Sequence, residues 1–314
     1  MTKLTVFSLK RNSKAEKQLS KFIYEYLSKS KRLSSSYKRS YRNLANHIEK
    51  FTGHTELIVN TDSFTEEFTG EFIEYLKEQN LMLSTVLSIF DKLKSSIRKA
   101  EKAGYPVDYG FENIEIKKED SCAVYLTIEE LERINALKNL SKEAEACRDR
   151  FLTGCFTALR ISDYRRLSVE ENFIKGCIHI KTQKTGESVV IPIHPVVWDI
   201  VDRNNNVLPK MPSQQSFGKT IKRICKRAGI TEPVLWERTV GNRIIRKKIP
   251  KYRLVSSHTA RRTGATNMYL SGISTARIML LTGHKTEQSF FRYIRIDKKE
   301  NARILSEHPF FKTK

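Results

Sequence analysis

Six side chains in the second half of this chain are of types that suit attack on a phosphodiester: two arginines, a lysine, two histidines and a tyrosine. They are Arg160, Lys184, His258, Arg261, His284 and Tyr293. A planar guanidinium group can meet two phosphate oxygens at once, so the two arginines form the candidate clamp for a phosphate. A tyrosine hydroxyl, with an ordinary pKa of about 10, is a poor nucleophile until a base or positive charge favours the phenolate. Tyr293 is therefore the candidate nucleophile, and His258, close to Arg261 in the sequence, can assist it.

The oxygen that leaves the phosphate needs a proton, and a lysine can deliver it when nearby cations lower its pKa. Two lysines, Lys181 and Lys184, lie in the segment 181–186. The flanking segments 176–180 and 188–193 have the composition of two strands of a hairpin, so this segment is predicted to be the turn between them. Lys184 is the candidate general acid, with Lys181 as the alternative.

Four short motifs resemble those of the tyrosine recombinases. They are Ala158-Leu159-Arg160-Ile161-Ser162-Asp163, His258-Thr259-Ala260-Arg261-Arg262-Thr263, Leu281-Thr282-Gly283-His284-Lys285 and Tyr293. Their order agrees with that family, and the tyrosine lies nine positions after His284. One motif alone would be weak, whereas four in order are specific. The distance from Lys184 to Pro192 also resembles the family pattern, which favours Lys184 over Lys181.

The resemblance implies a mechanism without a cofactor. Tyr293 would attack a DNA phosphate to form a 3'-phosphotyrosyl link, and strands would be exchanged through a Holliday junction. His284 would stabilise a phosphate oxygen by hydrogen bonding. Asp163 is interpreted as an orienting carboxylate or a helix cap rather than a catalyst, because a transferring phosphate would repel its charge. No nucleotide-binding Gly-x-x-x-x-Gly-Lys loop is present in the sequence. A metal is not required either, because the basic side chains supply the positive charge that divalent ions supply in two-metal nucleases.

The sequence predicts a mainly α fold with a small antiparallel β-sheet (α+β). Composition places a domain boundary between about Gly104 and Ser121, which gives a helical domain (residues 1–110), a linker (111–121) and a second domain (122–314). The resemblance implies that the first is a SAM-like core-binding domain and the second a catalytic domain with a C-terminal docking tail. Periodicity and breaks predict helices in the first domain at 14–29, 36–52, 63–79 and 83–103. In the second domain, Thr127 and Glu130 form a capping box, and further elements are expected. These are helices at 144–157, 213–228 and 297–305, and a second hairpin at 236–255.

The charge balance points to double-stranded DNA as the partner. Lysine and arginine number 57 against 35 acidic residues, a formal net charge of +22. No apolar run is long enough to span a membrane and the N-terminus does not resemble a signal peptide, so the protein is expected in the bacterial cytoplasm, associated with the nucleoid. Five scattered cysteines indicate neither a zinc site nor a disulfide framework, and are interpreted as reduced, mostly buried thiols.

By resemblance, the protein is expected to act as a homotetramer on paired sites, with accessory or directionality factors as further partners. Residues 297–314 would dock on a neighbouring protomer. The hairpin and the His258 motif look most like those of integrases of mobile elements, although too few residues precede the first helix for an arm-site-binding domain. Two alternatives stay open: a recombinase-derived DNA-binding regulator without catalysis, and a type IB topoisomerase.

Overall fold

The computed structural model describes residues 17–119, 122–294, 296, 298–307 and 310–312. The chain divides into two compact units. Unit 1 comprises Met1–Ser121 together with Glu237–Arg246, and unit 2 comprises Cys122–Trp236 together with Lys247–Lys314. The segment 237–246 is the end of a hairpin that was predicted to lie wholly in the second domain, and it packs with unit 1 instead. Each unit is described separately below.

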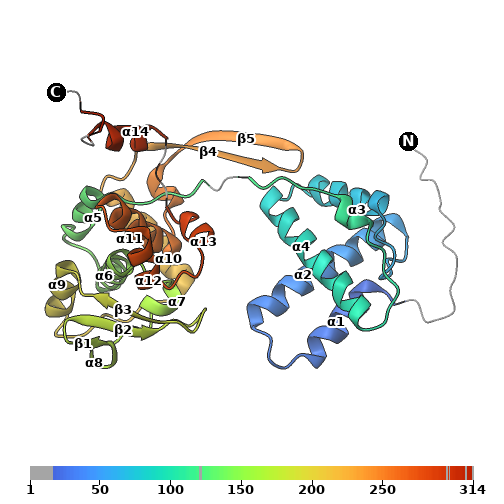
Figure 1. Ribbon diagram of the computed structural model, residues 1–314, viewed down its shortest axis with the longest axis horizontal. Helices are drawn as coiled ribbons and strands as arrows, with labels where there is room; N and C mark the ends of the chain where they lie inside the picture. The colour runs from blue at the N-terminus through green and yellow to red at the C-terminus, as the bar shows by residue number, and fades with distance from the viewer. Residues whose placement is uncertain (1–16, 120–121, 295, 297, 308–309, 313–314) are drawn as a thin grey trace. The chain divides into compact units, whose positions relative to one another are not determined.

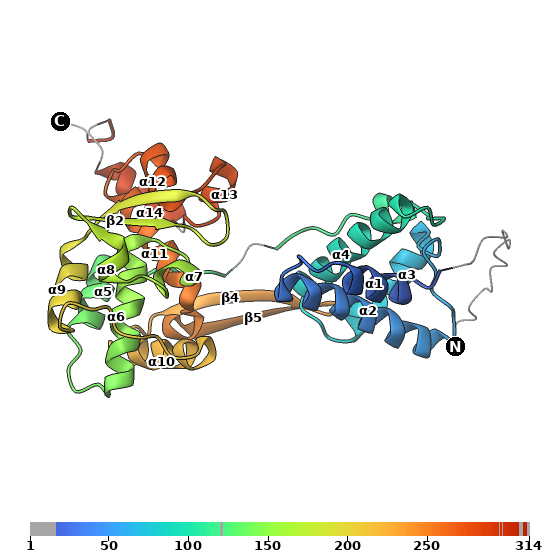
Figure 2. The same ribbon diagram turned by 90° about the horizontal axis from the view of Figure 1, so that it is seen from below.

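Unit 1 is a bundle of four amphipathic helices (Figures 1 and 2). They are α1 (Leu19–Lys29), α2 (Ser35–Thr55), α3 (Glu66–Glu78) and α4 (Leu83–Lys102), followed by the 3-10 helix η1 (Gly110–Asn113). Helix α2 begins where the Ser34 hydroxyl accepts a hydrogen bond from the Tyr37 N–H. Its buried residues recur at helical spacing along one face. Phe111 of η1 is fully buried in the same core, so the packed unit extends into the segment predicted to be a linker.

The first helix begins later than predicted. Its expected start at Lys14 lies outside the described residues, but Lys17 and Gln18 are not helical. Instead, Gln18 forms a β-bridge with Asn60, and the Leu19 N–H donates to the carbonyl of Val59. These pairings with a distant segment satisfy backbone groups that a longer helix would have used. The helical periodicity of the segment 14–29 carries no information on this pairing with residues 59–60.

Unit 2 contains most of the remaining helices. They are α5 (Ile128–Asn135), α6 (Lys142–Thr157), α7 (Ile161–Tyr164), α8 (Val169–Asn172), α9 (Pro195–Arg203), α10 (Gln214–Arg227), α11 (Ser257–Leu270), α12 (Thr275–Thr282), α13 (Glu287–Phe291) and α14 (Lys298–Ser306). Helix α6 is the central one, because it contacts α5, α7, α9, α10 and α11. Its residues from Cys147 to Cys155 are all buried, as expected for a helix covered on every side. The predicted capping box of Thr127 and Glu130 is confirmed at the start of α5.

The predicted first hairpin is confirmed and belongs to a three-stranded antiparallel sheet. Its strands are β1 (Phe173–Ile174), β2 (Cys177–Lys181) and β3 (Ser188–Pro192), in the order β1-β2-β3. Ile178 faces Ile191 across the sheet and Ile180 faces Val189, and all four side chains are buried. The residues between them are exposed, as the two-residue period of a strand requires. This register fixes the position of the 182–187 turn.

The second hairpin consists of β4 (Pro233–Val240) and β5 (Arg243–Pro250), which turn at Gly241 and Asn242. Gly241 has a positive φ of 58°, a backbone conformation that glycine adopts without steric cost. The strands begin before Trp236 and end before the predicted Val255, because the 3-10 helix η2 (Lys251–Leu254) follows them. Helix η2 leads directly to α11.

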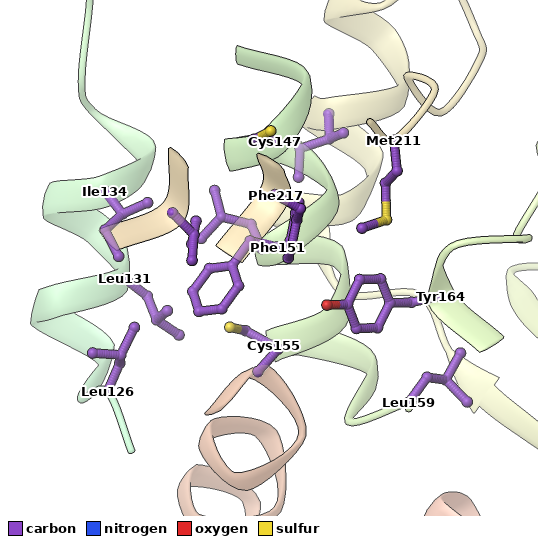
Figure 3. Packing of buried hydrophobic residues seen from close by; sticks show 14 of the residues in the cluster. Leu126, Leu131, Ile134, Cys147, Phe151, Cys155, Leu159, Tyr164, Met211 and Phe217 are labelled. Atoms are coloured by element: carbon purple, nitrogen blue, oxygen red, sulfur yellow. The ribbon is translucent and has the colours of Figure 1, made fainter. Parts of the chain in front are cut away.

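Aromatic side chains hold α7 and α10 against α6 (Figure 3). The Phe217 ring lies 6.4 Å from the Phe151 ring and 6.4 Å from the Tyr164 ring, between ring centroids. All three side chains are fully buried. Helix α7 is therefore packed against α6 and α10 through these rings. This packing fixes the position of Arg160, which immediately precedes α7.

The described cysteines are free thiols, and three of them are buried. Burial raises the pKa of Cys147 to about 11 and that of Cys225 to about 12. Thiols with such pKa values stay protonated near neutral pH and are poor nucleophiles. They therefore behave as core residues.

A glycine on α11 allows that helix to approach α6 closely. A Cβ atom added at Gly264 would lie 2.3 Å from the Cys155 carbonyl oxygen and 2.8 Å from the Ala158 Cβ. We expect Gly264→Ala to lower the free energy of unfolding by about 1–3 kcal/mol through overpacking. Chemical denaturation followed by tryptophan fluorescence measures this, since both tryptophans, Trp198 and Trp236, belong to unit 2.

The matched control is Gly218→Ala on α10, where an added Cβ meets nothing within 4 Å. Replacing glycine inside a helix then raises the free energy of unfolding by roughly 0.5–1 kcal/mol. Equal stability of the two variants would contradict the close approach of α11 to α6.

A buried carboxylate, Asp149, joins α6 to α9. Asp149 is 2% exposed and accepts hydrogen bonds from Arg148 Nε (2.9 Å), Arg203 Nη2 (2.5 Å) and Asn204 Nδ2 (2.9 Å). We expect Asp149→Ala to lower the free energy of unfolding by about 3–5 kcal/mol, because the Arg148 charge would be left buried without its counter-ion. The same fluorescence measurement applies. Asp202→Ala, at an exposed position on α9, is the control. If Asp149→Ala lowered the free energy of unfolding no more than this control does, the network would not stabilise the fold.

Candidate active site

Arg160 lies in the connection between α6 and α7. Helix α6 ends at Thr157, and the next residue, Ala158, has a φ of 52°, which turns the chain. Arg160 is the N-terminal flanking residue of α7. The Arg160 side chain is 9% exposed. Its Nε and Nη1 atoms are buried and have no hydrogen-bond partner among the described residues. Buried guanidinium donors without a partner are costly, which indicates a site suited to an anion.

Arg261 lies on the first turns of α11, a helix that begins with a reciprocal Ser256–Thr259 capping box. The side chain is 1% exposed. Its Nη1 donates to the Ala158 carbonyl at 2.9 Å, and its Nη2 donates to the Thr282 carbonyl at 2.9 Å. Nη2 also lies 2.9 Å from His284 Nε2, whereas Nε is buried and has no partner in the described part of the chain. The guanidinium plane is thus fixed by contacts at the end of α6 and at the end of α12, with Nε left for another acceptor.

His284 follows α12 through Gly283, whose φ of 67° is a left-handed conformation that ends the helix. The half-buried imidazole lies between the Thr282 hydroxyl, 2.7 Å from Nδ1, and Arg261. Desolvation, and then the charges of Arg261 and Arg160, lower the pKa of His284 to about 3. The imidazole is therefore neutral at physiological pH.

Tyr293 follows α13 and is half-buried beside these groups. Its ring centroid lies 5.1 Å from Arg261 Cζ and 5.0 Å from the His284 ring centroid. The Thr266 hydroxyl of α11 donates to the Tyr293 carbonyl at 3.3 Å. The phenol is thus held against the guanidinium group and the imidazole of its own chain.

Asp163 connects α7 to the turn that carries Lys184. The carboxylate is fully buried, and its Oδ1 accepts a hydrogen bond from the Gln183 N–H at 2.8 Å. Arg166 also contacts Asp163 Oδ1, at 3.4 Å, and donates to the carbonyl of Lys181. These bonds hold the β2–β3 turn against α7 and agree with the interpretation of Asp163 as an orienting carboxylate.

His258 and Lys184 have exposed side chains and lie at the edge of this cluster. Desolvation is the largest cause that lowers the pKa of His258. The positive charges of Arg262, Arg261, Lys184 and Arg160 lower it further. His258 is therefore neutral near pH 7 and can accept a proton, and the charge of Lys184 acts on the same region.

The structure brings Arg160, Arg261, His284 and Tyr293 together, with His258 and Lys184 within electrostatic range. Thr282 also belongs to this cluster, because its carbonyl accepts a hydrogen bond from Arg261 and its hydroxyl lies 2.7 Å from His284 Nδ1. A buried threonine two residues before a histidine carries no signal that distinguishes it from a core residue. Among the described residues no group of three or more His, Cys, Asp or Glu side chains could hold a metal. In the same part of the chain, every helix is too short or too polar to cross a bilayer.

Two buried arginines whose N–H groups lack a partner among the described residues, together with a nearby phenol, are groups of the types that a phosphoryl-transfer site requires. Comparison with known proteins agrees with this class. Residues 18–116 match the phage integrase SAM-like domain, and residues 124–300 match the phage integrase family. The chain therefore belongs to the phage integrase family and is a tyrosine-type site-specific DNA recombinase.

Solved structures of similar fold include the Tn1549 transposon integrase in complex with circular intermediate DNA. It is 14% identical, with a TM-score of 0.65, over 93% of this chain and 100% of that chain. A lambda integrase dimer bound to a COC' core site is 16% identical, with a TM-score of 0.63, over 90% and 77% of the two chains. The XerH recombinase bound to its difH substrate is 18% identical, with a TM-score of 0.59, over 92% and 84%. No curated protein matches the chain.

Proposed function

We propose that Tyr293 is the nucleophile of this recombinase and that Arg160 and Arg261 bind the phosphate it attacks. The observation that carries this proposal is the set of three buried guanidinium nitrogens, Arg160 Nε, Arg160 Nη1 and Arg261 Nε, without a hydrogen-bond partner in the described part of the chain. The Tyr293 ring lies beside the same guanidinium group of Arg261. A phosphate would satisfy these donors and would be placed next to the phenol.

In the proposed reaction the Tyr293 oxygen bonds to phosphorus while the bond to the 5' oxygen breaks. Neutral His258 takes up the phenolic proton, and Lys184 gives a proton to the departing 5' oxygen. A 3'-phosphotyrosyl link and a free 5'-hydroxyl result, so atoms and charge balance without an oxidant or nucleotide. Attack by the 5'-hydroxyl of a partner strand reverses these steps and joins the new strand. Lys184 is preferred to Lys181 because its charge acts on His258.

Unit 1 is proposed to bind the DNA next to the cleavage site. One face of α4 carries Lys94, Arg98, Lys99 and Lys102 around a surface recess. Basic side chains grouped on one helix face suit contact with successive phosphates. The domain limits proposed from the sequence remain a core-binding domain at 1–110, a linker at 111–121 and a catalytic domain at 122–314, whereas Phe111 and the segment 237–246 pack with unit 1.

We extend the proposal to assembly and biological role. A homotetramer on paired recombination sites, with accessory or directionality factors, would integrate, excise or invert DNA of a mobile element in the bacterial cytoplasm, in association with the nucleoid. The Tn1549 integrase, a transposon protein of similar fold, supports the mobile-element reading. The exposed aromatic side chains of Phe310 (82%) and Phe311 (55%) support docking of the C-terminal segment on a neighbouring protomer. Residues 297, 308–309 and 313–314 of the segment 297–314 lie outside the described residues.

The test is a covalent-adduct assay on nicked DNA taken from the ends of the protein's own element, in chelator and without metal. The nick lets the short fragment that carries the new 5'-hydroxyl diffuse away, so that religation fails and the protein stays attached to the DNA. We expect an adduct that survives denaturation and is lost on protease digestion. Tight binding to every element end without an adduct would overturn the proposal in favour of a DNA-binding regulator. Supercoil relaxation without sequence preference would overturn it in favour of a type IB topoisomerase.

A further inference from the structure

Arg150, in the middle of α6, is a buried arginine whose hydrogen bonds in the described part of the chain all go to backbone carbonyls. Its side chain is 5% exposed. Nη1 donates to the carbonyl of Tyr164 at 2.9 Å and to that of Leu167 at 3.1 Å. Nη2 donates to the carbonyl of Leu208 at 3.2 Å, and Nε donates to the carbonyl of Pro209. One guanidinium group therefore joins α6 to the end of α7 and to the segment that precedes α10.

Packing alone does not account for an arginine at this position. Burial lowers the pKa of Arg150 to about 10, and no carboxylate among the described residues offsets that effect. A buried charge without a counter-ion is costly, and an apolar side chain of similar size is often at least as stable in such a place. What an apolar side chain cannot supply is the set of hydrogen bonds to the four carbonyls.

These bonds bear on the candidate site because of what α7 carries. Helix α7 is a single turn of four residues, too short to be stable by itself. The Arg160 carbonyl accepts hydrogen bonds from the N–H groups of Asp163 at 2.8 Å and Tyr164 at 2.9 Å. Asp163 in turn holds the turn that carries Lys184, through the Gln183 N–H. Contacts that hold α7 therefore also position Arg160 and this turn.

We infer that Arg150 is a positioning residue, which fixes the end of α7 against α6 and the segment 208–209 and so holds Arg160 where it can bind the phosphate. The last carbonyls of a helix have no partner within the helix, and the Arg150 guanidinium supplies one. Arg165 adds a bond between the same two regions, from its Nη2 to the Pro212 carbonyl at 3.0 Å. The inference rests on the proposed function, because it takes Arg160 to be a phosphate ligand.

The first readout is the rate of adduct formation at saturating DNA, with DNA affinity measured in parallel by mobility shift. Arg150→Met keeps an unbranched side chain and removes the four hydrogen bonds. We expect it to slow cleavage about 10- to 100-fold, as a small misplacement of a catalytic group does, at wild-type affinity. Arg150→Lys should lie between, because one ammonium group cannot reproduce the planar fork. Arg277→Met, at an exposed position on α12, is the control and should cleave at the wild-type rate.

The second readout separates positioning of Arg160 from a general effect on the fold. Residues that act as a unit have non-additive effects. In a chain that already carries Arg160→Lys, Arg150→Met is therefore expected to slow cleavage further by less than about 3-fold. Equal slowing in both backgrounds would overturn the inference, as would a wild-type rate for Arg150→Met or a defect confined to DNA affinity.

Chemical denaturation shows whether each variant folds. If Arg150→Met does not fold, Arg150→Lys takes its place in both comparisons. Failure of both to fold would overturn the inference, because Arg150 would then serve the fold as a whole. A wild-type protein that forms no adduct would refute the proposed function and this inference with it. A wild-type adduct that Arg150→Met forms at the same rate would refute the inference alone.

Discussion

Tyr293→Phe is expected to abolish the covalent protein–DNA adduct while leaving the fold and DNA binding intact. The substitution removes only the hydroxyl. The ring that lies 5.1 Å from Arg261 Cζ and 5.0 Å from the His284 ring is retained, as is the bond from Thr266 to the Tyr293 carbonyl. Without a nucleophilic oxygen no phosphotyrosyl link can form. The loss should be complete rather than partial.

The measurement compares adduct yield on the nicked element end with DNA affinity in a mobility-shift assay at one salt concentration, because phosphate contacts make affinity depend strongly on salt. Tyr269→Phe is the matched control, since Tyr269 lies on α11 in the same unit and is exposed. It should form the adduct at the wild-type rate. A residual adduct in Tyr293→Phe, mapped by mass spectrometry to another residue, would show that the nucleophile had been misassigned.

Much of the fold could be predicted because its signals are local. The start of α5 follows from the reciprocal bonds of Thr127 and Glu130, and the β2–β3 hairpin follows from the alternation of buried and exposed side chains. The short strand β1 and the late start of α1 could not be predicted in this way. The start of α1 depends on the pairing of Gln18 with Asn60, far along the chain, whereas β1 pairs with the adjacent β2 but is two residues long, too short to show an alternation.

For the candidate site, too, residue types could be predicted from the sequence, whereas the contacts that orient them could not. Motif order suggested six residues by their type, and four of them lie together in the structure. The groups that orient Arg261 could not be inferred from residue type, because two of them are the backbone carbonyls of Ala158 and Thr282. A carbonyl is present at every residue and leaves no mark in the sequence. The contact between the Thr282 hydroxyl and His284 likewise depends on the folded end of α12 and cannot be inferred from residue type.

Arg261→Lys is expected to slow adduct formation by about 10²- to 10³-fold, the effect of removing one preorganised donor from a transition-state site. Lysine keeps the charge, but its single ammonium group cannot reproduce the planar fork. That fork reaches the Ala158 carbonyl through Nη1, and the Thr282 carbonyl and His284 through Nη2. With Nη2 absent, the interaction that holds the imidazole is lost as well, so the defect should be seen in the rate of cleavage at saturating DNA.

Arg277→Lys, an exposed position on α12, is the matched control and should cleave at the wild-type rate. A rate for Arg261→Lys within a few-fold of wild type would mean that the buried guanidinium group serves only the fold. Mixing Arg261→Lys with Tyr293→Phe adds a sharper test. The structure places Tyr293 against Arg261 of the same chain, so each variant protomer lacks one half of a single site. The mixture should remain inactive on an isolated half-site, and recovery of the adduct there would mean that the tyrosine is donated between protomers.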